Sequence, residues 1–210
     1  TFCAGFDLTS YIPLLTGARQ AEDDWDRAVL AVPGLVARAT LRDFDLGRPL
    51  IVAANGHAIA AGMEMLLAGD LRVVASGARL GLSEVRLGLI PAMGGTARLS
   101  RLVSPALAAE LLLTGNPIDA EGALAAGLVN YVAGADRVEE IALELAATIA
   151  ANAPLAVKAA RKVMRQAADL SKTEALALER SESETLSHTE DAKEGPRAFM
   201  EKRRPVFKGR

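Results

Sequence analysis

Residues 48–64 carry the strongest fold signal in the sequence, and they read Arg48-Pro49-Leu50-Ile51-Val52-Ala53-Ala54-Asn55-Gly56-His57-Ala58-Ile59-Ala60-Ala61-Gly62-Met63-Glu64. The apolar run from Pro49 to Ala54, ended by Asn55-Gly56, predicts a short buried strand followed by a turn. Residues 60–68 then predict a helix buried on most sides, because Glu64 is its only charged residue. A strand, a turn and a buried helix in this order are typical of an α/β core.

The chain on either side continues the alternation of strands and helices. Leu71–Ala75 predicts a second strand, and residues 80–82 predict a very short third one. Residues 91–96 form a Gly-rich turn that leads into a helix. Nearer the N-terminus, acidic residues precede an apolar periodicity and predict one amphipathic helix over residues 22–36.

The C-terminal half is predicted to be mostly helical. Helices are expected after the N-cap Asp119 and over residues 138–151, 155–168 and 174–187. Strands with crossover helices therefore precede a helical layer. We predict an α/β fold with its core in residues 1–135 and a helical region in residues 136–210.

Length, composition and charge exclude several classes of protein. The 210 residues, half of them hydrophobic, suffice for a packed core. With 24 Lys and Arg against 26 Asp and Glu, the net charge of −2 supplies no field that attracts nucleic acid. A single cysteine, Cys3, excludes an internal disulfide framework and a cysteine-based zinc site.

Targeting signals are not found in this sequence either. The longest uncharged run, Pro49–Met63, is too short to span a membrane, and no signal peptide is recognised. We therefore expect a cytoplasmic protein that binds no nucleic acid, membrane or metal. The chain opens with Thr1-Phe2-Cys3 and not with Met, so we also expect that an N-terminal part is missing.

Three turns rich in Gly and Ala are candidate ligand-binding segments, namely residues 3–7, 55–62 and 91–95. Small side chains let a ligand approach the backbone closely. The second turn runs directly into the predicted helix, whose first N–H groups have no intrahelical acceptor and can hold a phosphate or a developing oxyanion. In the alternative interpretation these turns serve packing alone.

Two glutamates twenty residues apart, Glu64 and Glu84, are the candidate acid and base. Both have apolar neighbours in the sequence, and burial raises the pKa of a carboxyl group. Such a pair near a Gly-rich turn is typical of proton-transfer chemistry. In the alternative interpretation, Glu64 forms an ion pair with Arg72 or Arg86, and Glu84 is exposed.

Other catalytic and cofactor motifs are incomplete. A Ser83–His57 hydrolase pair would lack the Gly-x-Ser-x-Gly elbow around its nucleophile. No Gly-x-Gly-x-x-Gly run follows a predicted strand, which argues against a dinucleotide site.

Seven segments follow one another in an order known from one protein family: residues 2–8, 48–56, 60–64, 88–95, 152–156, 190–199 and 201–205. They resemble the enoyl-CoA hydratase/isomerase (crotonase) family, and the resemblance spans nearly the whole chain. Residues 2–8 and the ending from Gly195 onward also resemble crotonobetainyl-CoA (carnitinyl-CoA) hydratases.

The resemblance implies a fold and an activity. The fold is a spiral of ββα units with a C-terminal helical region for trimerisation, assembled as a homotrimer or a dimer of trimers. The activity is hydration of a 2-enoyl-CoA in fatty acid metabolism, with no cofactor besides the coenzyme A of the substrate. The backbone N–H groups of Phe6 and Ala61 would form an oxyanion hole, and Glu64 and Glu84 fall on the two carboxylate positions of the hydratases.

The resemblance also implies which residues bind the acyl-CoA. Residues 9–47 are expected to line the acyl pocket. Contacts to the substrate or to its CoA are expected from Ala4, Asp7, Ala60, Gly62, Ala92, Phe199 and Lys202. Lys202 suits a phosphate by charge.

Three other functions are consistent with the sequence. An isomerase of the same fold would move the double bond with one carboxylate and no water. A carnitinyl-CoA dehydratase would act on a specialised substrate. A catalytically silent scaffold or RNA-binding protein is the third, and the near-neutral charge argues against it.

Overall fold

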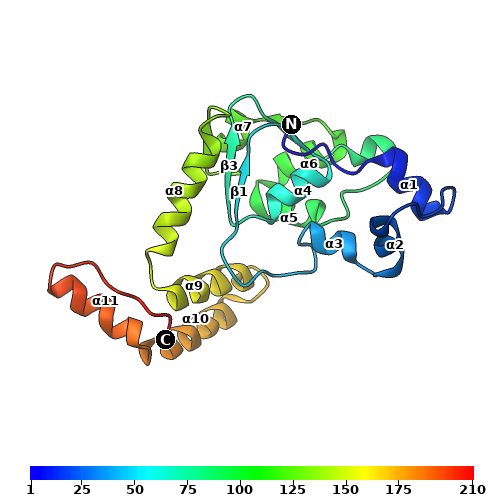
Figure 1. The fold of residues 1–210 in the computed structure, drawn as a ribbon. Coiled ribbons are helices and arrows are strands. Elements are labelled where there is room, and N and C mark those ends of the chain that lie inside the picture. Colours follow the sequence, from blue (N-terminus) through cyan, green and yellow to red (C-terminus); the bar gives the residue numbers. More distant parts are fainter. The chain divides into compact units, whose positions relative to one another are not determined.

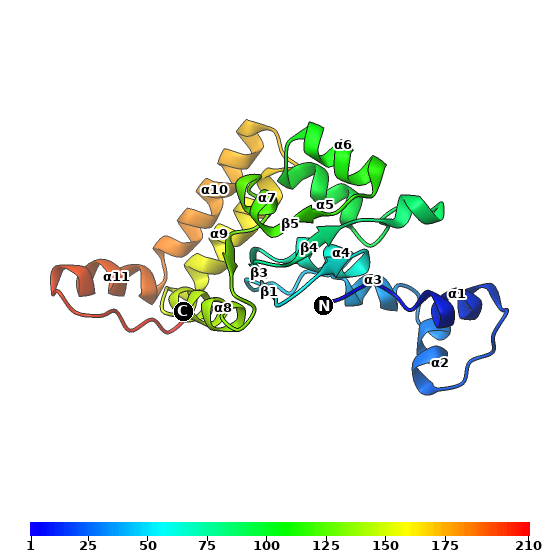
Figure 2. The ribbon, with the colours of Figure 1, turned by 90° about the horizontal axis from the view of Figure 1, so that it is seen from above.

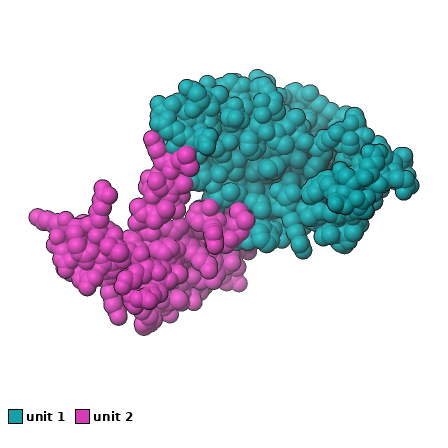
Figure 3. All heavy atoms as spheres, viewed as in Figure 1, with its two compact units in different colours: residues 1–45, 50–142 teal, residues 46–49, 143–210 magenta.

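A computed structural model describes residues 1–210 and divides them into two compact units. The core unit comprises Thr1–Asp45 and Leu50–Ala142, and the helical unit comprises Leu46–Pro49 and Leu143–Arg210 (Figure 3, teal and magenta). The change from one unit to the other falls within helix α8 (Val138–Ala150). The boundary expected from the sequence, between residues 135 and 136, lies just before this helix.

The first sheet of the core unit is parallel and contains three strands in the order β1-β3-β6. Strand β1 (Ile51–Ala54) pairs with β3 (Leu71–Ala75), and β3 pairs with β6 (Tyr131–Ala133) (Figure 1). Val73 and Val74 in the central strand are fully buried. The apolar residues of β1 and β3, interrupted only by Arg72, suit strands that are covered on both faces, so these two predicted strands are confirmed.

The second sheet contains three short strands in the order β2-β4-β5. Strand β2 (Ala58–Ile59) is parallel to β4 (Arg79–Gly81), which is antiparallel to β5 (Ile118–Asp119). Helix α4 (Ala61–Ala68) follows β2 directly and packs against it and against α5 (Gly95–Leu102) (Figure 2). The predicted buried helix is confirmed, because all of α4 except Met65 is buried.

Several short helices of the core unit lie next to the strands of the second sheet in the chain. A 3-10 helix η1 (Glu84–Leu87) follows β4, and α6 (Pro105–Thr114) and α7 (Ala120–Ala125) flank β5. Helix α1 (Leu8–Thr16) lies near the N-terminus (Figure 1, blue).

The single helix predicted over residues 22–36 is wrong. The structure has two helices there, α2 (Asp24–Ala31) and α3 (Leu35–Ala39). Pro33 lacks a backbone N–H, and Gly34 adopts a φ of 76° that no helix contains. The Pro-Gly pair therefore ends the first helix, although the apolar periodicity continues through it.

The helical unit is built around two neighbouring helices, α9 (Pro154–Ala167) and α10 (Lys172–Ser187), which lie side by side (Figures 1 and 2). Pro154 begins α9, and Ser171 and Glu174 form a capping box at the start of α10. These local signals explain why α9 and α10 were predictable from the sequence. Helix α11 (Glu190–Met200) follows, and the last residues of the chain fold back on it.

No single helix is both long enough and apolar enough to cross a membrane. Only α8 and α9 taken together, as a bent pair, reach the required length and composition.

Candidate active site

A cavity of about 350 Å³ in the core unit brings together most of the residues singled out in the sequence. Its volume is near the lower end of the range for small-molecule sites. The walls come from the N-terminal turn, α1, α4, η1 and the turn before α5. The lining residues are Ala4, Phe6, Leu8, Tyr11, Ile12, Ala60, Glu64, Ser83, Glu84, Leu87, Leu89, Ile90, Ala92 and Met93.

Glu64 lies in the first turn of α4, and its side chain is held by the turn before α5. The residue is only 2% exposed. Its Oε1 accepts hydrogen bonds from the N–H of Met93 at 2.7 Å and of Gly95 at 2.9 Å. Burial raises the pKa of Glu64, while these two N–H donors oppose the rise. One carboxylate oxygen is thus fixed in the wall, and the other is left for chemistry.

Glu84 begins η1 and faces the same cavity. Its Oε2 is buried and has no hydrogen-bond partner. Burial raises the pKa of Glu84, and the negative charge of Glu64 raises it further. An unpaired buried carboxyl oxygen costs free energy, so its retention beside a second carboxylate indicates a functional role.

The alternative interpretation of the two carboxylates is wrong. Glu64 makes no ion pair with Arg72 or Arg86. Arg72 donates to the carbonyl oxygens of Leu128 and Gly69. Arg86 donates to the carbonyl of Thr114 and to the side chain of Asn116. Glu84 is half-buried and not exposed.

Backbone N–H groups gather where the N-terminal turn crosses the start of α4. Cys3 forms a parallel bridge to Ala58, and its carbonyl lies so close to Gly62 that a Cβ there would be 2.2 Å away. Gly5 has a φ of +101°, and a Cβ built on it would lie 3.5 Å from the nitrogen of Ala61. The turn therefore brings the backbone of residues 5 and 6 to the first turn of α4.

The two N–H groups expected to form an oxyanion hole are not used by the fold. Phe6 donates no hydrogen bond to another backbone group. Ala61 is the first residue of α4, so its N–H has no intrahelical acceptor, and no side chain caps the helix. The preceding residue, Ala60, adopts φ 52° and ψ −124°, which is unusual for alanine. This geometry suits an anion near the N-terminus of α4.

Of the other residues of the core unit expected to contact the substrate, some line the cavity and some do not. Ala4, Ala60 and Ala92 line the cavity. Gly62 does not line the cavity and instead packs closely on Cys3. The carboxylate of Asp7 is engaged in capping α1, because it accepts hydrogen bonds from the N–H of Thr9 at 3.0 Å and from two neighbouring hydroxyls, and these bonds lower its pKa. A substrate contact by Asp7 stays a prediction.

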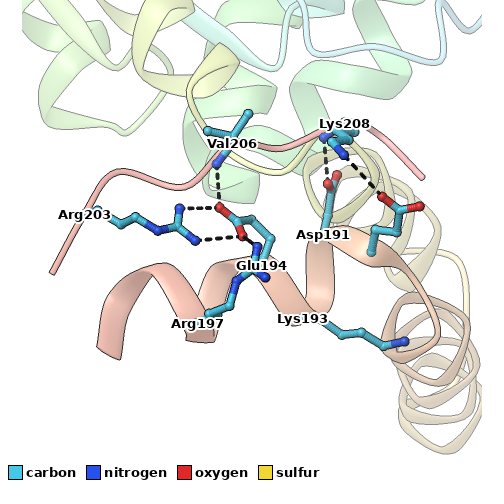
Figure 4. Close-up of a pocket in the computed structure, with 8 residues that line it drawn as sticks. Asp191, Lys193, Glu194, Arg197, Arg203, Val206 and Lys208 are labelled. Carbon is cyan, nitrogen blue, oxygen red and sulfur yellow. Dashed lines mark hydrogen bonds and ion pairs between the residues drawn. The ribbon is translucent and has the colours of Figure 1, made fainter. Parts of the chain in front are cut away.

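Phe199 and Lys202 belong to the helical unit. Phe199 is 84% exposed at the end of α11, and Lys202 follows with a φ of 53°. Their contacts to CoA stay predictions. A cavity of about 550 Å³ in this unit contains carboxylates that hold the C-terminal segment: Glu194 accepts from Arg203 and from the N–H of Val206 (Figure 4).

Some lining residues were predicted only as members of longer segments. Met93 lies in the candidate turn 91–95, but the backbone N–H that it contributes leaves no trace in side-chain chemistry. Tyr11 lies in the range 9–47 expected to line the acyl pocket and Ile90 in the segment 88–95, but in the sequence their side chains resemble ordinary packing residues. Ser83 lines the cavity, but His57 does not and instead accepts the N–H of Arg79 at 2.9 Å, so the hydrolase pair is not formed.

No group of three or more His, Cys, Asp and Glu side chains is arranged to hold a metal ion. The groups that could take part in a reaction at this site are two carboxyl groups and unpaired backbone N–H donors, beside an apolar wall. Such a site can stabilise a developing oxyanion and move protons on either side of it.

Comparison with known proteins agrees with this geometry. The family described as enoyl-CoA hydratase/isomerase matches residues 1–210. The chain is 45% identical over 163 residues to a 2,3-dehydroadipyl-CoA hydratase of Escherichia coli, which covers 78% of this chain and 64% of that protein. It is 39% identical over 213 residues to a carnitinyl-CoA dehydratase of Proteus mirabilis, covering 100% of this chain and 77% of that protein.

Solved structures show the same likeness. A structure of an enoyl-CoA hydratase from Mycobacterium tuberculosis has a TM-score of 0.87 and 36% identity, covering 100% of this chain and 77% of the other. One from Bacillus anthracis has a TM-score of 0.86 and 37% identity, with 100% and 78% covered. The chain thus spans between 64% and 78% of the length of these similar proteins.

Proposed function

Because the chain belongs to the enoyl-CoA hydratase/isomerase family and has its crotonase-type fold, we propose that it adds water to the 2,3 double bond of an enoyl-CoA thioester. The observation that carries the proposal is the presence of two carboxyl groups on one cavity: that of Glu64, which is buried, and that of Glu84, whose Oε2 is buried and unpaired. Hydration needs one proton to be taken from the water that adds to the β carbon and one proton to be given to the α carbon. Two carboxyl groups of unequal environment can perform both.

The oxyanion hole would hold the thioester oxygen. As water adds, electrons from the double bond move onto this oxygen, and its negative charge grows. The N–H groups of Phe6 and Ala61, which the fold leaves without backbone partners, would donate to it. Each such donor contributes about 3–4 kcal/mol to transition-state stabilisation in comparable sites.

The surroundings of the two glutamates support different roles. Glu64 receives two backbone N–H donors, which favour its ionised form, so it would act as the base. Glu84 lacks a donor at Oε2 and faces the charge of Glu64, which favours its protonated form, so it would act as the acid. Water gives a proton to Glu64 as its oxygen bonds to the β carbon, and Glu84 gives a proton to the α carbon.

Both proton transfers use side chains of the chain itself, so we propose that the reaction needs no cofactor beyond the coenzyme A of the substrate. An isomerase would need only one carboxyl group and no water, so the second glutamate favours hydration. By analogy with the family, we also propose that the chain acts in fatty acid metabolism and assembles as a trimer or a dimer of trimers.

Crotonyl-CoA hydration, followed by the loss of absorbance of the conjugated thioester, tests the proposal. We expect activity in the unmodified protein and a loss of about 1,000-fold or more in kcat for Glu64→Gln and for Glu84→Gln, because amides cannot exchange these protons. Glu110→Gln, at an exposed position of α6, is the matched control and should retain full activity.

Two results would count against the proposal. A near-normal kcat in either glutamine variant would show that the replaced carboxyl group has no catalytic role. Double-bond migration without incorporation of oxygen from ¹⁸O-labelled water would assign the chain to the isomerases of the family instead.

A further inference from the structure

The part of the cavity wall beyond the two carboxyl groups is strongly apolar. Leu8 and Ile12 come from α1, Leu87 from η1, and Leu89 and Ile90 from the segment that follows. Glu64 and Glu84 are the only charged residues that line the cavity. A cation on a bound acyl chain would therefore find no counterion except these two carboxyl groups, and an anion would find none.

These apolar side chains are unusually exposed for their size. Ile90 is 68% exposed, Leu87 is 61% and Leu89 is 50%. Apolar surface in water is unfavourable, and an apolar ligand that covers it gains free energy in proportion to the area buried. Their position on the same cavity as the two glutamates makes a substrate chain the natural occupant.

The cavity has an aromatic wall at one side. The rings of Phe6 and Tyr11 stack with centroids 5.0 Å apart and an interplanar angle of 20°. Both residues also line a second cavity of about 570 Å³, whose other walls carry Arg19 and acidic residues such as Asp23. The stacked pair thus separates a small apolar cavity from a larger charged one.

Resting on the proposed function, we propose that the site selects a short, uncharged hydrocarbon acyl chain and that the Phe6–Tyr11 pair limits its length. A terminal carboxylate would lose its hydration against leucine and isoleucine side chains and would meet two glutamates. A terminal ammonium group would likewise be desolvated by this wall. The small cavity volume restricts the chain to a few carbons beyond the thioester.

The closing experiment compares substrates that differ in the charge at the end of the acyl chain. The kcat/KM of trans-2-hexenoyl-CoA is measured against that of 2,3-dehydroadipyl-CoA, which has the same six carbons and a terminal carboxylate, and against crotonobetainyl-CoA, which carries a cation. We expect hexenoyl-CoA to exceed each charged substrate by about 30-fold or more. From four to six carbons, kcat/KM should rise about fourfold per methylene group.

Variants test the selectivity against charge and the selectivity for chain length separately. Ile90→Arg places a cation in the apolar wall and should raise kcat/KM for dehydroadipyl-CoA about tenfold relative to hexenoyl-CoA. Leu113→Arg, at a 77% exposed position outside the cavity, should not change this ratio. Tyr11→Ala should join the two cavities and shift the best chain to eight or more carbons, at about tenfold higher relative kcat/KM. Tyr11→Phe keeps the ring and should keep the original length preference.

The outcomes distinguish this inference from the proposed function. Hydration of hexenoyl-CoA with an equal or higher kcat/KM for a charged substrate would overturn the inference and leave the hydratase function standing. A folded Tyr11→Ala variant with an unchanged length preference would overturn the role of the ring pair. Inactivity toward every enoyl-CoA tested would overturn the proposed function and this inference with it.

Discussion

Gly95 donates its backbone N–H to Oε1 of Glu64 at 2.9 Å, across 31 positions of sequence. A Cβ at residue 95 would lie 2.9 Å from both the Oε1 and the Cγ of Glu64, and 2.8 Å from the Cβ of Pro91. Only a hydrogen atom fits at this point. The carboxylate is therefore held by the backbone of a neighbouring turn that must come this close.

Gly95→Ala is expected to displace the carboxylate of Glu64 and to lower kcat for enoyl-CoA hydration by about 10- to 100-fold, because small misplacements of a catalytic group are costly. Overpacking should also lower the free energy of unfolding by about 1–3 kcal/mol. Steady-state kinetics and denaturant unfolding measure the two effects. Gly77→Ala is the matched control, since nothing lies within 4 Å of the added carbon. Equal kcat in both variants would show that the close contact has no role in positioning Glu64.

The raised pKa values of the two glutamates predict a bell-shaped pH profile. Burial raises the pKa of Glu64 and of Glu84 above the usual 4.5. The base must be ionised, so activity should fall as pH decreases through the raised pKa of Glu64. The acid must be protonated, so activity should fall as pH increases through the raised pKa of Glu84. Because the two groups interact, the limbs report values of the pair.

The profile of kcat/KM for crotonyl-CoA, recorded from about pH 4 to about pH 10, measures both limbs. Activity that stays constant on the alkaline side would contradict the assignment of Glu84 as a protonated acid. Circular dichroism at each pH controls for unfolding.

Ala60 stores backbone strain beside the proposed oxyanion hole. Its φ of 52° is rarely adopted by residues with a Cβ. Ala60→Gly removes this strain and should leave the free energy of unfolding unchanged or raise it by up to about 1 kcal/mol. The neighbouring Ala61 has ordinary helical geometry as the first residue of α4, so Ala61→Gly should lower the same quantity by about 0.4–1 kcal/mol. Chemical denaturation compares the pair, and equal destabilisation by both changes would refute strain at residue 60.

The parts of the fold that the sequence predicted have strong local signals. Strand β1 is a continuous apolar run and β3 is apolar except for Arg72, while α9 begins with a proline and α10 with a capping box. Strands β2 and β5 contain two residues each, too few for any pattern. Both are paired with β4, which lies at a distant position in the chain. Long-range pairing of this kind has no local signature.

The candidate site likewise contains residues that the sequence predicted and groups that only the fold reveals. Glu64 and Glu84 were predicted because a carboxylate among apolar residues is conspicuous, and the structure brings both to one cavity. The N–H groups of Met93 and Gly95, which hold Glu64, are invisible in a sequence because every residue except proline has one. The role of Tyr11 can be recognised only in the structure, because its stacking on Phe6 and its place on two cavities are not visible in the sequence.

Two buried carboxylates fasten the C-terminal segment to α11 in the helical unit (Figure 4). Asp191 accepts the N–H groups of Lys208 at 2.7 Å and of Gly209 at 2.8 Å. Glu194 accepts from Arg203 at 2.6 and 3.0 Å and from the N–H of Val206 at 3.0 Å. These contacts order a segment that has no regular secondary structure of its own.

Glu194 should make the helical unit sensitive to acid. Hydrogen bonds from Arg203, above all, hold its pKa well below the usual 4.5. The carboxylate thus contributes stability that is present above about pH 4.5 and is lost as pH falls through the lower folded-state pKa. Glu194→Gln should lower the Tm of the protein at neutral pH and flatten the decline of Tm below pH 4.5, because the titrating group is gone. Glu201→Gln, which removes a largely exposed partner of the same arginine, is the control and should change neither. Parallel Tm curves for the unmodified protein and Glu194→Gln across this pH range would show that Glu194 does not fasten the segment.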